Sequence, residues 1–141
     1  MNVYSRPTRY DGVRVLVAED SAINRRLSQL LLEMIGCTAT CVSTGFHVVE
    51  AFQGGDVDLV LMDISMPGLD GFEATARIRE IEHARGGRRH VPIVGVTAFA
   101  LPSDRNHCIR RGMDDCLIKP LRKEMLIDTL GRWLNVASLC A

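Results

Sequence analysis

The chemistry of this chain is expected at Asp63, a carboxylate that ends the apolar run Asp58–Met62. A short apolar run bounded by turn-forming residues is typical of a strand buried on both faces. Other chemically active side chains follow other apolar runs in the same way: Glu19, Asp20, Thr97 and Lys119. Open α/β sheets bind their ligands at the carboxyl ends of the strands. We therefore expect three carboxylates, one hydroxyl and one ammonium group to meet at one edge of a sheet.

Such a group of side chains suits Mg²⁺-dependent transfer of a phosphoryl group. Three neighbouring carboxylates repel one another unless a cation joins them. Mg²⁺ favours one or two carboxylates together with phosphate oxygens. With the ion between Glu19/Asp20 and Asp63, one oxygen of Asp63 can attack phosphorus and form an acyl phosphate. Lys119 would neutralise charge on the phosphoryl oxygens and Thr97 would donate a hydrogen bond to them. The sequence thus predicts Mg²⁺, with Mn²⁺ as an alternative, and Asp63 as nucleophile.

Each of these residues has an ordinary structural explanation when it is taken alone. An aspartate after a strand is commonly a turn residue. A Glu-Asp pair before a helix commonly complements the helix dipole. The prediction depends on the combination, because four strand ends carry chemically matched groups.

The elements that position these residues alternate along the chain. Strands are predicted at residues 13–18, 38–42, 58–62, 91–96 and 116–118. Helices are predicted at residues 22–35, 46–52, 72–83, 103–111 and 123–134. In the first helix we expect one core-facing stripe made of residues 23, 27, 30, 31, 34 and 35. The alternation predicts a parallel sheet with helices on both faces, in one of a few doubly wound strand orders.

Composition restricts the class of protein. The chain has 141 residues, the size of one domain, with 47% hydrophobic and 24% charged residues. Its formal net charge is zero, so bulk charge gives no reason to expect a nucleic-acid or anionic-membrane partner. No apolar run approaches the ~20 residues of a membrane span. The five cysteines include no CxxC pair and are expected to be reduced thiols in a cytosolic protein.

The residues at the strand ends resemble those of a two-component receiver (response-regulator) domain. The resemblance covers residues 13–134 and is carried by these motifs: Val15-Leu16-Val17-Ala18-Glu19-Asp20, Leu61-Met62-Asp63-Ile64-Ser65-Met66-Pro67, Asp70-Gly71, Val96-Thr97-Ala98 and Lys119-Pro120. It implies a single three-layer α/β sandwich of the flavodoxin-like type, with a five-stranded parallel sheet in the order 2-1-3-4-5 and five helices.

The resemblance also assigns a role to each site residue. It implies that Asp63 accepts a phosphoryl group from a phosphohistidine on a histidine kinase or a histidine phosphotransfer domain. It places Mg²⁺ on Asp20, on Asp63 and on the main-chain carbonyl of Ser65, with Glu19 binding chiefly through water. Thr97 and Lys119 become ligands of the phosphoryl group, and the Lys119–Pro120 bond is expected to be cis. Such a module phosphorylates and dephosphorylates itself and is not a turnover enzyme.

Within the family, the chain is most similar to receivers of hybrid sensor histidine kinases. This resemblance is carried by four motifs: Ala22-Ile23-Asn24, Gly71-Phe72-Glu73-Ala74-Thr75, Gly112-Met113-Asp114-Asp115 and Arg132-Trp133-Leu134. We accordingly expect a receiver domain at residues 13–135 between tails at 1–12 and 136–141. The location is expected to be cytoplasmic, on its own or as the cytoplasmic part of a membrane-bound kinase. This domain itself is expected to contact neither membrane nor nucleic acid. The partner face, and a weak homodimer, are expected at the fourth and fifth helices, residues 103–134.

One position departs from the family pattern, and two other functions remain as alternatives. Cys116 stands where the family usually has an aromatic residue that turns inward on phosphorylation, so the region around residues 99–111 is expected to carry the signal instead. An aspartyl phosphatase or phosphotransferase would usually need a second aspartate at position 65, which is Ser65. A docking pseudo-receiver would not need the intact set of site residues.

Overall fold

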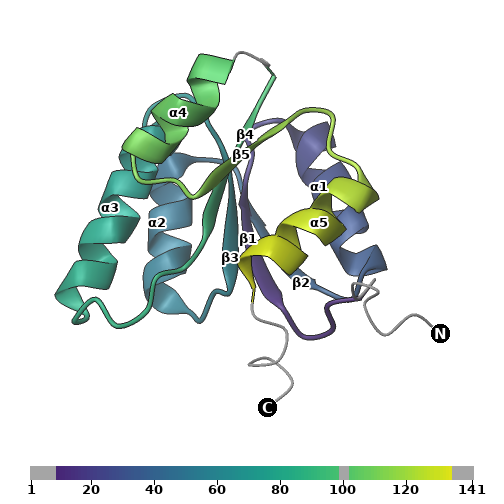
Figure 1. The fold of residues 1–141 in the computed structure, drawn as a ribbon, viewed down its shortest axis with the longest axis horizontal. Coiled ribbons are helices and arrows are strands. Elements are labelled where there is room, and N and C mark those ends of the chain that lie inside the picture. The colour runs from purple at the N-terminus through teal and green to yellow at the C-terminus, as the bar shows by residue number, and fades with distance from the viewer. Residues whose placement is uncertain (1–8, 99–101, 135–141) are drawn as a thin grey trace.

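The computed structural model describes residues 9–98 and 102–134, which form a three-layer α/β sandwich (Figure 1). Its five strands are parallel and lie in the order β2-β1-β3-β4-β5. The strands are β1 Arg14–Ala18, β2 Thr38–Val42, β3 Leu59–Asp63, β4 Ile93–Thr97 and β5 Asp115–Ile118. The helices are α1 Ala22–Met34, α2 Gly45–Gly54, α3 Gly71–Ala84, α4 Pro102–Arg110 and α5 Lys123–Trp133. The flavodoxin-like fold and its strand order are confirmed.

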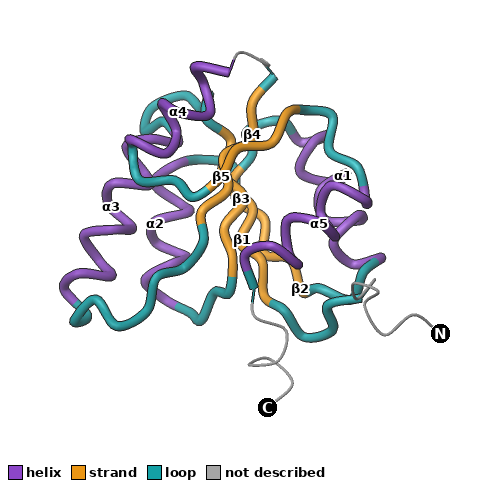
Figure 2. The backbone as a smooth tube through the Cα atoms, in the orientation of Figure 1, coloured by secondary structure: helices purple, strands orange, loops and turns teal. Residues whose placement is uncertain are grey.

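The helices are divided between the two faces of the sheet. Figure 2 shows α1 and α5 on one face and α2, α3 and α4 on the other. Each face has its own apolar core, one packed around Leu16, Val60 and Met62 and the other around Val15, Leu59 and Leu61. Adjacent residues of β1 and β3 serve opposite cores because successive side chains of a strand alternate in direction. No helix among the described residues is long and apolar enough to cross a bilayer.

Most element ends lie within two residues of their predicted positions, and the shifts have local causes. The fourth strand begins at Ile93, and not at Val91, because Pro92 has no N–H to donate to the ladder. The third strand extends one residue further than predicted, to Asp63, which pairs with Val96 of β4. This pairing holds the backbone of Asp63 against β4, one residue beyond the last pair between β3 and β1.

The predicted limits of α1 agree with local signals. The hydroxyl oxygen of Ser21 accepts a hydrogen bond from the Asn24 N–H at 3.4 Å, as expected of an N-cap residue. Gly36 follows the helix with a φ of +92°, a conformation that glycine adopts without a Cβ clash.

The orientation of α1 differs from the prediction. Ser28, Leu32 and Ile35 face the core, and Leu31 is half-buried. The other apolar positions of the helix form a separate exposed stripe, with 82% exposure at Ile23, 38% at Leu27, 43% at Leu30 and 58% at Met34. The prediction of one core-facing stripe was wrong because this helix has apolar residues around more of its circumference than one sheet face can cover.

The expected N-terminal tail is partly folded. Tyr10 is buried in the core between the sheet and the α1/α5 layer, and its N–H donates to the Ile35 carbonyl at 2.6 Å. Residues 1–8 and 136–141, which the sequence also assigns to tails, lie outside the described residues, as does residue 135, the predicted last residue of the domain.

Candidate functional site

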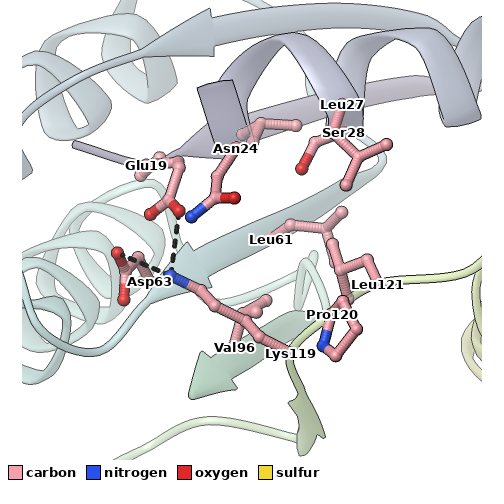
Figure 3. Close-up of a pocket in the computed structure, with 12 residues that line it drawn as sticks. Glu19, Asn24, Leu27, Ser28, Leu61, Asp63, Val96, Lys119, Pro120 and Leu121 are labelled. Atoms are coloured by element: carbon pink, nitrogen blue, oxygen red, sulfur yellow. Dashed lines mark hydrogen bonds and ion pairs between the residues drawn. The ribbon is translucent and has the colours of Figure 1, made fainter. Parts of the chain in front are cut away.

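The structure brings the predicted site residues from separate strand ends to one edge of the sheet (Figure 3). Asp63 ends β3, Glu19 follows β1 and Lys119 follows β5. Lys119 Nζ lies 2.8 Å from Glu19 Oε1 and 3.3 Å from Asp63 Oδ2. The two carboxyl groups are almost completely buried, and the lysine holds them together as a bridging cation. Glu19 and Lys119, which lie 44 and 56 positions from Asp63 along the chain, therefore meet it in space, as the parallel topology predicts.

The three carboxylates fit a hard divalent cation. One ligand oxygen each from Glu19, Asp20 and Asp63 can be chosen so that all lie within 4.8 Å of one another. Among the described residues, Glu19 Oε2 is the one buried side-chain nitrogen or oxygen atom that has no hydrogen-bond partner. A buried carboxylate oxygen without a partner is costly, and a cation or a cation-bound water would remove that cost. Asp20 is exposed, so an ion here could keep solvent ligands.

Burial and crowding change the proton affinities of the two buried carboxyl groups. Burial, together with a hydrogen bond and repulsion from Glu19, raises the pKa of Asp63 to about 7 against the opposing effect of Lys119. Burial also disfavours ionised Glu19, but hydrogen bonds with Asp63 and Lys119 outweigh it and lower the pKa of Glu19. Without a cation, the proton affinity of the pair is therefore raised at Asp63 and lowered at Glu19.

Main-chain groups complete the surroundings of Asp63. The Ser65 N–H donates to Asp63 Oδ1 at 3.1 Å and orients the carboxylate. The Lys119 N–H donates to the Thr97 carbonyl at 2.8 Å, which ties the end of β5 to the end of β4. The Lys119–Pro120 bond is cis, as the resemblance implied. The Ser65 carbonyl as an ion ligand and the Thr97 hydroxyl as a phosphoryl ligand remain predictions.

Two polar residues of α1 that support the site were not predicted as site residues. Arg25 donates to the carbonyls of Glu19 and Asp20 at 2.9 and 3.0 Å. Asn24 lines the site beside Glu19 (Figure 3), and its side chain contributes to lowering the pKa of Glu19. Apolar periodicity gives no information on such contacts, and only the short distance in sequence from Glu19 could have suggested them.

A glycine allows the loop after Asp63 to pack closely against the end of β3. A Cβ atom on Gly71 would collide with the Asp63 carbonyl and the Ile64 Cα. The Gly71 N–H instead donates to the Ile64 carbonyl at 3.1 Å. The start of α3 is thereby held directly against the end of β3.

A pocket of about 400 Å³, including open solvent, lies beside Asp63 between α1 and the segment after β5 (Figure 3). Its walls are largely apolar and include Leu27, Val96 and Leu121, while Glu19, Asp63 and Lys119 form its polar end. The pocket thus places Asp63 at the polar end of a hollow with apolar walls next to α1.

Cys116, which stands where the family usually has an aromatic residue, follows a buried aspartate that contacts both α4 and α5. The Cys116 side chain is half-buried, and its thiol lies 3.9 Å from the Leu117 carbonyl. Asp115 is buried and accepts hydrogen bonds from Arg132 and from the Trp133 indole, both at 3.0 Å. An ion pair of 3.3 Å joins Asp115 to Arg105, so one carboxylate connects α4 with α5. Residues 99–101, part of the expected signalling segment, lie outside the described residues.

Comparison with known proteins identifies relatives of this chain. A family model, described as the response regulator receiver domain, matches residues 15–131. The chain is 40% identical over 124 residues to the sensor protein GacS of Pseudomonas syringae pv. syringae, and the match covers 88% of this chain and 14% of that relative. The chain thus spans about a seventh of that relative's length.

Two solved structures combine a similar fold with a described ligand or partner. One is the receiver domain of the sensor histidine kinase PA1611 from Pseudomonas aeruginosa PAO1, with a magnesium ion in its active-site cleft. It is 38% identical, has a TM-score of 0.74, and the match covers 86% of this chain and 97% of that one. The other is the receiver domain of Ssk1 in complex with the histidine phosphotransfer protein Ypd1 from Saccharomyces cerevisiae. It is 27% identical, has a TM-score of 0.79, and covers 88% and 90% of the respective chains.

Proposed function

This chain belongs to the response regulator receiver domain family, and from that premise we propose that Asp63 is the phosphoacceptor of a two-component phosphorelay. The donor is a phosphohistidine on a histidine kinase or a histidine phosphotransfer protein, and the reaction requires Mg²⁺. The observation that carries the proposal is the buried Asp63 carboxyl group, which faces Lys119 and shares a cation-sized space with Glu19 and Asp20. If the chain is part of a longer protein, we propose a hybrid histidine kinase, as in its relatives.

The residues of the site give a balanced reaction. An oxygen of Asp63 attacks phosphorus, the P–N bond to the donor imidazole breaks, and its electron pair stays on the imidazole nitrogen. Lys119 faces the acceptor oxygen and offsets charge on the phosphoryl group, and the Thr97 hydroxyl donates to a phosphoryl oxygen. Bound Mg²⁺ supplies further positive charge at this group. Because Asp63 has a pKa of about 7 without a cation, it must first lose its proton, which solvent at the exposed edge can take.

The exposed apolar stripe of α1 has the spacing of a surface that packs against a helix of another protein. Ile23, Leu27, Leu30 and Met34 are separated by four, three and four residues, the spacing of a seam that packs against another helix. Leu27 also lines the pocket beside Asp63, so a partner helix on this stripe would lie next to the acceptor. We propose this stripe, in place of α4 and α5, as the face that meets the phosphohistidine-bearing helix. The described part of residues 103–134 exposes only Ile109 and Ile118 as large hydrophobic side chains.

Intact-protein mass spectrometry tests the acceptor assignment. We expect acetyl phosphate with Mg²⁺ to add one phosphoryl group to the wild-type chain, and Asp63→Asn to prevent the addition. Asp56→Asn is a matched control, because Asp56 is an exposed aspartate whose side chain lies 3.3 Å from Arg14 at the other end of the sheet. No mass gain on the folded wild-type protein would overturn the proposal. Sustained hydrolysis of a phosphomonoester would instead favour a phosphatase.

A further inference from the structure

We infer that Arg25 is a positioning residue that holds the loop between β1 and α1 in the conformation required for cation binding. The inference rests on the proposed function, because it concerns how Glu19 and Asp20 are presented to the ion. The relevant observation is that one guanidinium nitrogen of Arg25 donates to two successive main-chain carbonyls, those of Glu19 at 2.9 Å and Asp20 at 3.0 Å.

The loop needs such support because it leaves the sheet at this point. The Glu19 N–H still pairs with the Val42 carbonyl of β2 at 3.0 Å. Beyond it, β1 has ended and α1 begins only at Ala22. The carbonyls of Glu19 and Asp20 lie beyond the end of β1 and before α1, and buried or half-buried main-chain carbonyls need a donor. Arg25 supplies donors to both of them, and its own N–H donates to the Ser21 carbonyl at 2.8 Å. The loop is therefore tied at three consecutive carbonyls to a single residue.

Asp20 depends on this support more than Glu19 does. The Glu19 carboxylate has its own contact with Lys119 at 2.8 Å. The Asp20 carboxylate is exposed and has no hydrogen-bond or ion-pair partner among the described residues. Its position near Asp63 is consequently set by the backbone alone. Arg25 fixes the peptide groups on both sides of Asp20 through the carbonyls of residues 19 and 20, and so restricts the directions that the side chain can take.

The charge of Arg25 is placed where it does not compete with the ion. Its side-chain hydrogen bonds go to neutral carbonyls, while the carboxylates of the cluster remain available to a cation. A loop that is ordered before the ion binds avoids the entropy cost of ordering it during binding. Removal of the guanidinium should thus weaken ion binding without changing the groups that carry out phosphoryl transfer.

Calorimetric titration of the metal-free protein with Mg²⁺ measures this effect directly. We expect Arg25→Met to raise the Mg²⁺ dissociation constant about tenfold, which corresponds to about 1.4 kcal/mol. Arg25→Lys should fall between Arg25→Met and the wild type, because an ammonium group can still donate to a carbonyl. Arg26→Met is the matched control: Arg26 is the adjacent exposed arginine, and among the described residues its side chain hydrogen-bonds only to Gln29 within α1.

Phosphorylation by acetyl phosphate at increasing Mg²⁺ separates positioning from catalysis. Arg25→Met should need more Mg²⁺ for half-maximal rate and reach the wild-type rate at saturation. Equal dissociation constants for Arg25→Met, Arg26→Met and wild type would overturn the inference, as would a rate that stays low at saturating Mg²⁺. If Arg25→Met is unfolded by circular dichroism, the folded Arg25→Lys variant decides the question by the same comparison. A wild-type chain that binds Mg²⁺ but accepts no phosphoryl group would refute the proposed function alone.

Discussion

Replacing Asp63 by asparagine should stabilise the metal-free protein at neutral and alkaline pH. The Asp63 carboxyl group is buried beside Glu19, and these surroundings raise its pKa from the ordinary 3.8 to about 7. Below pH 4 the group is protonated in both the folded and the unfolded chain. Between pH 4 and 7 the folded chain holds a proton that the unfolded chain has lost. Stability attributable to Asp63 therefore falls as pH rises through this window and is constant above it.

The size of the effect follows from the two pKa values. A rise from 3.8 to about 7 corresponds to an upper limit of about 4 kcal/mol for ionising Asp63 in the folded chain. Because the site opens at the edge of the sheet, where water raises the effective dielectric constant, we expect about 1–3 kcal/mol. Asparagine has the same shape and carries no charge, so it avoids this penalty. The stabilisation should be largest at pH 8 and smaller at pH 5.

Urea unfolding followed by circular dichroism, with EDTA present, provides the measurement. Wild type, Asp63→Asn and the control Glu33→Gln, which removes an exposed carboxylate of α1, would be compared from pH 5 to pH 8. Mg²⁺ at about 100 times its dissociation constant should stabilise the wild type by about 2.7 kcal/mol and the asparagine variant much less. If wild type and Asp63→Asn lose stability equally between pH 5 and 8, Asp63 does not hold a proton at neutral pH and the reasoning is refuted.

Three further predictions concern the surroundings of the site. Ile23→Asp on the α1 stripe should slow phosphorylation by a phosphohistidine protein at least tenfold but leave phosphorylation by acetyl phosphate unchanged. The control Ile109→Asp should affect neither reaction. If Ile23→Asp slows both reactions equally, the stripe has no docking role. Gly71→Ala should lower the free energy of unfolding by about 1–3 kcal/mol in urea titrations, because its Cβ would collide with the end of β3; an unchanged midpoint would show that the loop can move away. Asp115→Asn should cost about 1–3 kcal/mol and shift the emission of Trp133, the single tryptophan of the chain, because the indole and two arginines lose their shared carboxylate; unchanged stability and emission would argue against this connection of α4 and α5.

The sequence alone was sufficient to predict the sheet and the position of Asp63 at its edge. Apolar runs that end in polar groups define strands whose carboxyl ends must share one edge if all strands are parallel. Helical segments between them require that parallel arrangement. Glu19, Asp63 and Lys119 could therefore be placed together without coordinates, and the distances of 2.8 and 3.3 Å from the lysine confirm the grouping.

Features that depend on which surfaces meet could not be predicted in this way. The periodicity of α1 did not reveal that Leu32 faces the core while Ile23 and Met34 face solvent, because apolar residues cover several sides of that helix. The burial of Tyr10, in a segment with the composition of a tail, depends on a packing space that forms only when the helices are in place.

The raised pKa of Asp63 and the contacts of Arg25 likewise depend on the tertiary structure. A pKa depends on the burial of a group and on its distance from other charges, and neither quantity is a property of local sequence. A guanidinium that binds two main-chain carbonyls leaves no periodic or compositional pattern. Sequence order fixes which residues lie at the strand ends, while proton affinity and loop conformation arise only when the folded chain brings Glu19, Asp63 and Lys119 out of water and into contact.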